Sequence, residues 1–223
     1  FTAKLTPAQV ELLKKNPNVM GVYPDFMFQL APEPIRKIPD NLVISQQTLS
    51  CAVEKAGGPV DGSRKATWIW ILDTGIDLDH PDLNVQTRPL FARSFIDGQT
   101  VEDGHGHGTH VAGIAAARNN RIGVVGVSAG ATVVPVKVLA NSKRGSWSSL
   151  IGGLNHVAMH KIPGDVVNMS LGAFPINDCA ASNPALVNAI RNLDAANVWL
   201  VMAAGNDSGN ANLNAPGCIN GKR

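Results

Sequence analysis

Apolar residues beyond residue 47 fall into two patterns that alternate along the chain. Short continuous apolar runs are typical of strands buried on both faces of a parallel sheet, and they predict strands at 68–72, 133–139, 166–169 and 198–203. Segments with helical spacing predict helices at 111–117, 148–160 and 184–196. This alternation indicates an α/β fold, a three-layer parallel sheet with helices on both faces.

The first 30 residues predict a small α+β unit. Thr6 and Gln9 have the pattern of a capping box, and Pro7 lies at the first helical position. The helix is expected to end before Pro17, and the apolar segment 19–23 predicts a strand after it.

The distribution of proline divides the chain. Three prolines between residues 31 and 41 favour an extended linker. We therefore expect three parts: a small unit at 1–30, a linker at 31–46 and an α/β domain at 47–223.

Composition excludes several classes of protein. With 44% hydrophobic and 16% charged residues, a sizeable core can be buried. The net charge is only +2 and no basic stripe is present, which argues against a nucleic-acid partner. The longest nearly unbroken apolar stretch, 198–204, is too short to span a bilayer, so no membrane contact is expected.

Three short motifs place polar side chains after predicted strands or before a predicted helix. Asp73 directly follows the run at 68–72, His107 lies between two glycines before a helix, and Asn206 follows the run at 198–203. Each alone is also typical of a turn, a cap or a structural histidine. Because the carboxyl ends of parallel strands share one edge of a sheet, the three together indicate a ligand or catalytic site.

These motifs resemble those of the subtilisin-like serine peptidases, the subtilases of peptidase family S8. The resemblance runs from about residue 47 to 223, and its four motifs are in family order at 71–77, 107–113, 168–172 and 203–206. It implies that Asp73 is the acid of a catalytic triad, His107 its general base and Asn206 the donor to the oxyanion.

The resemblance also implies a binding site for an extended peptide or protein substrate. Ser170, Leu171 and Gly172 resemble the strand that pairs with the substrate backbone and forms one wall of the S1 pocket. The segment 139–147, which contains Gly145 and Trp147, resembles the opposite strand, and the resemblance implies that Trp147 lines S4. Binding would add the peptide as a strand to these edges.

A structural calcium site is a further implication. The loop at 118–124 resembles the high-affinity calcium loop of the family, and all its donors are oxygens, as Ca²⁺ requires. The matching positions are Gln47, Asp82, Arg118, Asn120, Ile122 and Val124. An ordinary asparagine-rich turn is the alternative.

The unit at 1–30 resembles the C-terminal half of an inhibitor I9-type propeptide. This implies a secreted, monomeric enzyme made as a zymogen, inhibited by its own propeptide and cleaved between Leu30 and Gln47. In an extracellular setting we expect a disulfide between Cys179 and Cys218, with Cys51 free or paired beyond residue 223.

One departure from the family concerns the nucleophile. The Gly-Thr-Ser-Met-Ala motif that carries the family's serine does not occur in residues 1–223. We therefore expect the sheet to be incomplete at its C-terminal side and the chain to be inert by itself.

Other classes of function stay open at this point. A catalytically dead peptide-binding remnant is one, and an aspartic peptidase using Asp73-Thr74-Gly75 is another. His105, His107 and His110 resemble part of a zinc motif, whereas the pair at His156 and His160 is expected on the surface.

Overall fold

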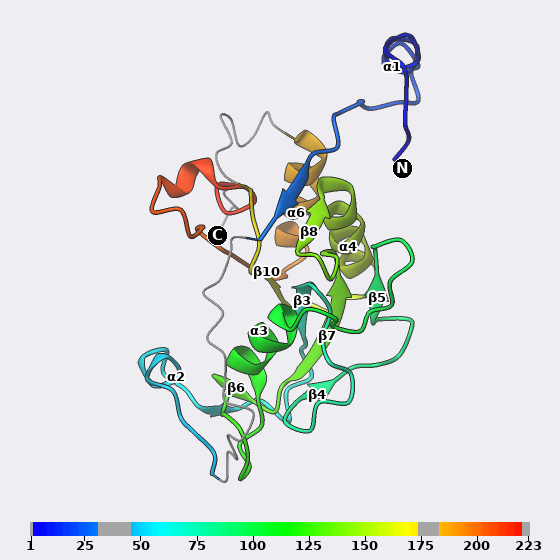
Figure 1. The fold of residues 1–223 in the computed structure, drawn as a ribbon. Helices are drawn as coiled ribbons and strands as arrows, with labels where there is room; N and C mark the ends of the chain where they lie inside the picture. The colour runs from blue at the N-terminus through cyan, green and yellow to red at the C-terminus, as the bar shows by residue number, and fades with distance from the viewer. Residues whose placement is uncertain (1, 31–45, 174–182, 220–223) are drawn as a thin grey trace.

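The computed structural model describes residues 2–30, 46–173 and 183–219. A parallel sheet runs through its centre in the order β10-β9-β3-β7-β4, and β5 also pairs with β7 (Figure 1). Its strands are β3 (Ile69–Asp73), β4 (Asn84–Val85), β5 (Arg93–Ser94), β7 (Thr132–Lys137), β9 (Val166–Met169) and β10 (Trp199–Met202). The predicted parallel α/β class is confirmed.

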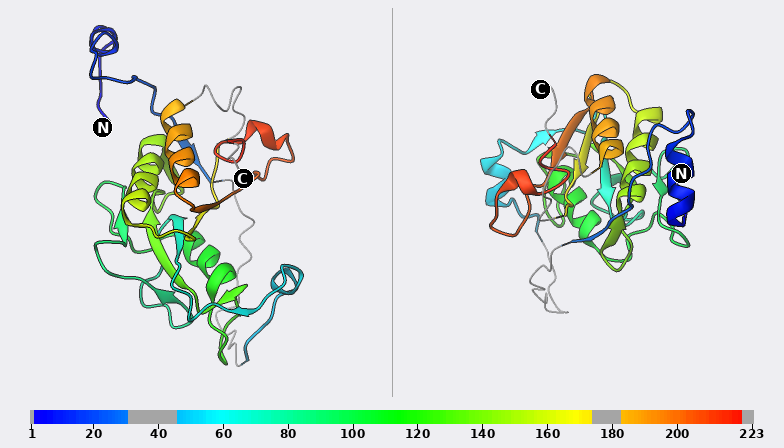
Figure 2. Two further views of the ribbon diagram at one scale, coloured as in Figure 1. Left: turned by 180° about the vertical axis from the view of Figure 1, so that it is seen from behind. Right: turned by 90° about the horizontal axis from the view of Figure 1, so that it is seen from above.

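Helices cover the two faces of this sheet. The helices are α3 (His107–Ala116), α4 (Trp147–His160) and α6 (Pro184–Ala195). α4 and α6 lie side by side on one face and α3 lies on the other (Figure 2). Trp70 and Leu72 of β3 belong to the core cluster that includes α4 and α6, whereas Ile71 joins the cluster with α3. The continuous apolar run of β3 therefore serves two cores at once.

The strand at the β10 edge differs from the prediction. A strand buried on both faces was expected at 198–203, but Trp199 is 56% exposed and Val201 52% exposed. β10 is the last strand in the sheet order and, within the described part of the chain, pairs only with β9. An apolar run therefore reports a preference for burial, and the neighbouring elements decide whether it is met.

The N-terminal region confirms one prediction and contradicts another. Helix α1 (Pro7–Lys14) begins with the expected capping box between Thr6 and Gln9, and none of its residues is buried. Segment 19–23 is not a strand, and Met20 in it is 98% exposed. The strand is instead β1 (Met27–Gln29), which pairs antiparallel with β8 (Arg144–Ser146). Extended backbone becomes a strand only where a partner strand is available.

Four smaller elements complete the described part. Strand β2 (Val60–Asp61) pairs in parallel with β6 (Ser128–Ala129), and a short helix, α2 (Cys51–Lys55), precedes them. The 3₁₀ helix η1 (Ala211–Leu213) follows β10. In the described ranges no helix is both long and apolar enough to cross a membrane.

Cysteines and histidines give two further outcomes. Cys51 is free and exposed, and Cys218 is disulfide-bonded; its predicted partner, Cys179, lies outside the described residues. His156 was expected on the surface, but it is only 2% exposed. Its ring packs against Trp70 and Phe95, and its Nε2 lies 2.8 Å from the carbonyl oxygen of Phe91. His156 is one of the buried residues of helix α4, so it lies on the mostly apolar face of the helix that packs into the core.

Candidate active site

Asp73 is the last residue of β3 and is completely buried. β3 lies between β7 and β9; pairing with β9 extends to Ile71, and pairing with β7 extends to Asp73 itself. Its Oδ1 accepts a hydrogen bond of 2.7 Å from the N–H of Thr74, whereas its Oδ2 is buried without a hydrogen-bond partner. A carboxylate so far from water needs a strong hydrogen-bond partner in addition to the N–H of Thr74.

His107 provides that partner. Its Nδ1 lies 2.7 Å from Asp73 Oδ1. His107 opens helix α3, and Gly106 before it has φ 101°, a left-handed conformation that glycine adopts without strain. A Cβ at Gly108 would collide with the carbonyl oxygen of Gly75. The glycines of this motif therefore let the start of α3 approach the loop after β3 closely enough for the two side chains to meet.

The electrostatics of the pair follow from its burial. Burial raises the pKa of the Asp73 carboxyl above its ordinary value, and the hydrogen bond and charge of His107 oppose that rise. A proton on His107 Nδ1 directed at Asp73 leaves proton transfer to Nε2 of the ring. The arrangement can therefore act as an oriented general base.

Asn206 has different surroundings. It lies in the loop after β10, at the same edge of the sheet as Asp73, but it is exposed, and among the described residues no hydrogen bond is seen from its side chain to Asp73 or His107. The neighbouring Asn214 is 3% exposed. Its amide fills the space beside Gly172 and Gly205, and its Oδ1 has no hydrogen-bond partner.

Ser170, Leu171 and Gly172, predicted to bind substrate, follow β9 directly. Ser170 Oγ accepts a hydrogen bond of 2.9 Å from Asn168, and Leu171 is 2% exposed. The segment continues into a bridge between Ala173 and Ala215.

The opposite predicted edge, at Gly145 and Trp147, is covered by the chain's own residues. Gly145 is paired with Phe28 in the β1–β8 ladder, and the N–H of Trp147 donates to Phe26 O at 3.1 Å. The rings of Phe28 and Trp147 lie 4.9 Å apart, and both side chains are buried. The strand predicted to bind a substrate peptide therefore already pairs with β1 of the same chain.

Three of the predicted calcium ligands, Arg118, Asn120 and Val124, come together around the amide of Gln47, whereas no contact among the described residues places the Ile122 carbonyl there. Gln47 Nε2 lies 2.7 Å from Arg118 O, 3.2 Å from Val124 O and 3.4 Å from Asn120 Oδ1. Asp82 Oδ1 accepts from the amide of Asn120 at 2.7 Å. Three oxygens thus converge on one point, and turning the Gln47 amide over would present its own oxygen there. This donor set fits Ca²⁺.

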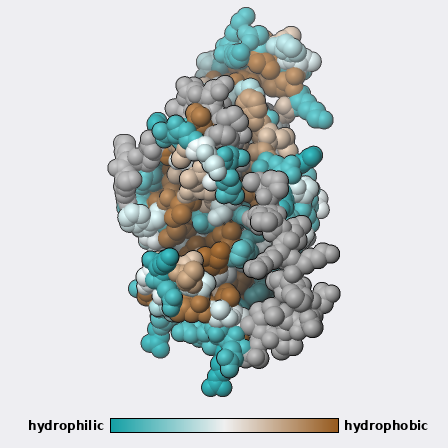
Figure 3. Space-filling view, turned by 60° about the vertical axis from the view of Figure 1, so that its left-hand side comes forward, coloured by the Kyte–Doolittle hydropathy of each residue, from teal (hydrophilic) through white to brown (hydrophobic). Residues whose placement is uncertain are grey.

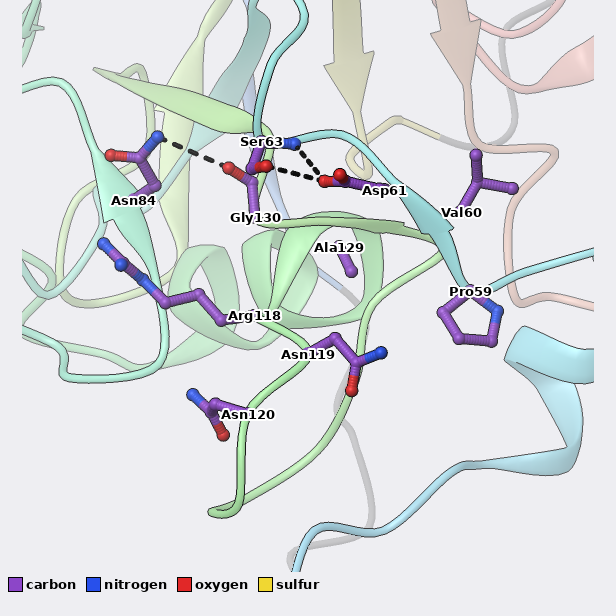
Figure 4. A pocket seen from close by; sticks show the side chains of 10 residues that line it. All are labelled: Pro59, Val60, Asp61, Ser63, Asn84, Arg118, Asn119, Asn120, Ala129 and Gly130. Carbon is purple, nitrogen blue, oxygen red and sulfur yellow. Dashed lines mark hydrogen bonds between the residues drawn. The ribbon is translucent and has the colours of Figure 1, made fainter.

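A hollow of about 630 Å³ lies beside this loop (Figure 4). Its lining includes neither Asp73 nor His107 and is mostly polar; the residues are Pro59, Val60, Asp61, Ser63, Asn84, Arg118, Asn119, Asn120, Ala129 and Gly130. The hollow shares Arg118 and Asn120 with the predicted calcium ligands, and it is separate from the Asp73–His107 pair.

The alternative zinc motif is not assembled. His107 directs its Nδ1 to Asp73, and His105 uses its Nδ1 to accept from the N–H of His107 at 3.2 Å. Nowhere in the described ranges do three histidine, cysteine or carboxylate side chains form a group that could hold a metal ion.

Sequence reasoning missed two charged residues beside the pair. Asp103 lies four positions before His107 and accepts several hydrogen bonds from the loop around it. Lys137 is completely buried in β7, opposite Asp73 in the strand register. A lysine inside an otherwise apolar strand was a signal that could have identified the second.

Comparisons with known proteins identify the family of this chain. The model of the family described as "Subtilase family" matches residues 64–221. Subtilisin amylosacchariticus of Bacillus subtilis subsp. amylosacchariticus is 33% identical over 217 residues, covering 96% of this chain and 51% of that protein. A cuticle-degrading protease of Metarhizium anisopliae is 32% identical, with 97% and 53% covered.

A solved structure gives the same result for the fold. The crystal structure of a cold-adapted subtilisin-like serine proteinase aligns with a TM-score of 0.59 and 26% identity, covering 72% of this chain and 54% of the other. The chain thus spans about half the length of the curated relatives it matches.

Proposed function

Because this chain belongs to the subtilase family, we propose that it is part of a secreted serine endopeptidase that uses Asp73 and His107. The observation that carries the proposal is the 2.7 Å contact between His107 Nδ1 and the buried Asp73 carboxylate at the carboxyl end of a central strand. The serine that completes the triad does not occur in a Gly-Thr-Ser-Met-Ala segment of residues 1–223, and the rest of the protein would supply it.

The proposed reaction assigns each residue a role. His107 Nε2 takes the proton of the serine hydroxyl as its oxygen attacks the peptide carbonyl, and then gives that proton to the leaving amine. Asp73 holds the ring in the required tautomer and stabilises the imidazolium. Asn206 donates to the oxyanion as it forms. Water then hydrolyses the acyl-enzyme by the same steps.

We further propose that residues 1–30 act as a propeptide whose end inhibits the enzyme. Antiparallel pairing of β1 with β8 supports this, because an extended substrate would use the same edge. Burial of Phe28 and Leu30 and hydrogen bonds from Ser148 to the Asp25 carboxylate strengthen the contact. Cleavage would fall between Leu30 and Gln47, and substrates would occupy the edges at 145–147 and 170–172.

Calcium is proposed as a structural ion with no part in the chemistry. Gln47, Asp82 and Asn120 would bind it by their side chains, and Arg118, Ile122 and Val124 by their carbonyl oxygens. An ion that binds only the folded state stabilises it by mass action. The full-length protein should therefore melt at a lower temperature in chelator, and Asp82→Asn should remove that difference. Equal melting temperatures with and without calcium would contradict the site.

The catalytic proposal is tested on the full-length protein and on residues 1–223 side by side. Each is incubated with a peptide that has a large apolar P1 residue, with and without a sulfonyl fluoride. We expect inhibitor-sensitive hydrolysis from the full-length protein and none from residues 1–223. An inactive full-length protein that still binds peptide would instead support a peptide-binding remnant.

An aspartic peptidase is the remaining alternative. It needs two carboxylates that share a proton, whereas the side chain that contacts the Asp73 carboxylate is the imidazole of His107. Activity that survives the sulfonyl fluoride but is lost with pepstatin would favour this alternative.

A further inference from the structure

Asp103 accepts five hydrogen bonds although it is itself no part of the Asp73–His107 pair. Its Oδ1 accepts from the N–H groups of His105 at 3.0 Å and Gly106 at 2.8 Å, and from the Thr74 hydroxyl at 2.9 Å. Its Oδ2 accepts from the N–H and the hydroxyl of Thr109, at 2.9 and 2.6 Å. One carboxylate therefore binds the segments on both sides of His107 and the residue that follows Asp73.

Thr74 is the link between the two halves of the pair. Its N–H donates to Asp73 Oδ1, and its hydroxyl accepts from the N–H of Gly108 at 2.9 Å while donating to Asp103. Thr74 is completely buried. Asp73 and His107 are thus connected through Thr74 and Asp103 as well as through their direct contact.

The charge of Asp103 suits this place. Helix α3 begins without a side-chain cap of its own, and a carboxylate close to the first N–H groups of a helix is stabilised by the helix dipole. Partial burial raises the pKa of Asp103, but the hydrogen bonds from Thr109, Gly106 and His105 outweigh it and hold the pKa below its ordinary value. The carboxylate is therefore ionised at neutral pH and accepts all five hydrogen bonds.

Lys137 fixes the same loops from the other side. Its ammonium donates to the carbonyl oxygen of Thr74, to Glu102 O at 3.3 Å and to Asn141 Oδ1 at 2.8 Å. Glu102 precedes Asp103, so the lysine holds the backbone next to both Thr74 and Asp103. The Thr74 hydroxyl is bound to the carboxylate, and the Thr74 carbonyl is bound to the ammonium.

We propose that Asp103 is a positioning residue for the proposed peptidase reaction: it sets the angle and distance at which His107 meets Asp73. The inference rests on the proposed function, because the effect on turnover exists only if the pair is catalytic. Its effect on the geometry of the His107–Asp73 hydrogen bond does not depend on turnover.

The test compares three variants of the full-length protein. Asp103→Ala removes all five acceptor contacts, whereas Asp103→Asn keeps one oxygen and loses the second. Asp165→Asn is the matched control: Asp165 is completely buried and also accepts from Trp68, Trp70 and Ile162, but it lies at the other end of the sheet. Both Asp103→Asn and Asp165→Asn should lower the melting temperature.

Of these three variants, only the two at Asp103 should change turnover per folded molecule. Because a misplacement of about 1 Å can cost about 10²-fold, we expect kcat to fall about 10²-fold in Asp103→Ala and about 10-fold in Asp103→Asn, with KM nearly unchanged. Thr109→Ser keeps the hydroxyl bound to Asp103 and should retain activity, whereas Thr109→Val should not. Normal kcat in Asp103→Asn and Thr109→Val would overturn the proposal, even if Asp103→Ala fails to fold.

A second readout separates this proposal from the proposed function. The His107 Nδ1–H proton in its short hydrogen bond to Asp73 should give a downfield NMR signal in the wild type. We expect the signal to move or broaden in Asp103→Asn but not in Asp165→Asn. An inactive wild type with this response would refute the peptidase assignment alone, whereas an unchanged signal in Asp103→Asn would refute the positioning role.

Discussion

Asp73 and Asn206 both follow strands of one parallel sheet, yet their surroundings differ. Asp73 ends a strand with a neighbour on each side, is completely buried and contacts His107 at 2.7 Å. Asn206 follows the edge strand β10, is exposed, and lies after a strand whose Trp199 and Val201 also face solvent. The elements packed around Asp73 hold its side chain in place. A sequence motif such as the one around Asn206 does not hold a side chain in place without such neighbours.

The same contrast extends across the surface. Large apolar side chains are exposed on the β10 side at Trp199 and Val201, and Ile114 of α3 is 48% exposed. Figure 3 shows hydrophobic surface gathered across the middle of one face. On the interior side, β3 and β7 are buried along almost their whole length. The β10 side therefore exposes large apolar side chains on a strand of the central sheet.

The largest expected effect comes from removing the imidazole that contacts the buried Asp73. In the full-length protein, His107→Ala should lower kcat about 10⁶-fold, the size of the loss of a triad member in the subtilisin series. The measurement is hydrolysis of a peptide per mole of protein, with circular dichroism as the check on folding. A folded His107→Ala variant with more than about 1% of wild-type kcat would contradict the assigned role.

Asn206 should matter less, because an oxyanion donor contributes only one hydrogen bond. In the full-length protein we expect Asn206→Ala to lower kcat about 10²–10³-fold with little change in KM. Asn212→Ala, an exposed asparagine in the same loop, is the control and should leave kcat unchanged. If the two variants behave alike, Asn206 does not bind the oxyanion.

The exposed strand should govern the solution behaviour of residues 1–223. An edge strand with apolar side chains is a template for association with other chains. We expect residues 1–223 to self-associate, and Trp199→Lys with Val201→Lys to raise several-fold the concentration at which sedimentation detects it. Met159→Lys changes an apolar residue that is 73% exposed on helix α4 and should have little effect. Equal effects of both changes would show that the β10 edge does not drive the self-association.

The smallest expected effect is the contribution of the buried His156 to the pH dependence of stability. Burial lowers the pKa of His156 below its ordinary value of 6.5, an effect that the nearby His160 and Arg93 reinforce and the Phe91 carbonyl opposes. The unfolded chain then binds the proton more readily, so the free energy of unfolding should fall as the pH drops below 6.5.

His156→Phe keeps an aromatic ring among Trp70 and Phe95 and removes the titration. Denaturant unfolding of the full-length protein at pH 8 supplies the baseline for both proteins, because a histidine is neutral there. From that baseline to about pH 5, the stability of the variant should change less than that of the wild type. Parallel curves would show that His156 is not responsible.

Much of the fold could be predicted from local patterns. The run at 68–72 became β3, the capping pattern at Thr6 became α1, and the apolar spacing at 148–160 became α4. These predictions succeed because strand and helix periods, caps and glycine conformations are properties of a few neighbouring residues. The close approach at the glycines around His107 could also be predicted locally, because the motif itself shows that these positions lack side chains.

Other features depend on residues far apart in sequence. Segment 19–23 is not a strand while 27–29 is, because β8 offers its edge only to the latter. The burial of His156 follows from the face of α4 that meets β3, and the five contacts of Asp103 require two loops to meet. The sequence by itself determined which residues can form strands, helices and a triad pair. The tertiary structure decided which of them are buried, paired and held in position, because burial and hydrogen bonding depend on partners that only the folded chain brings together.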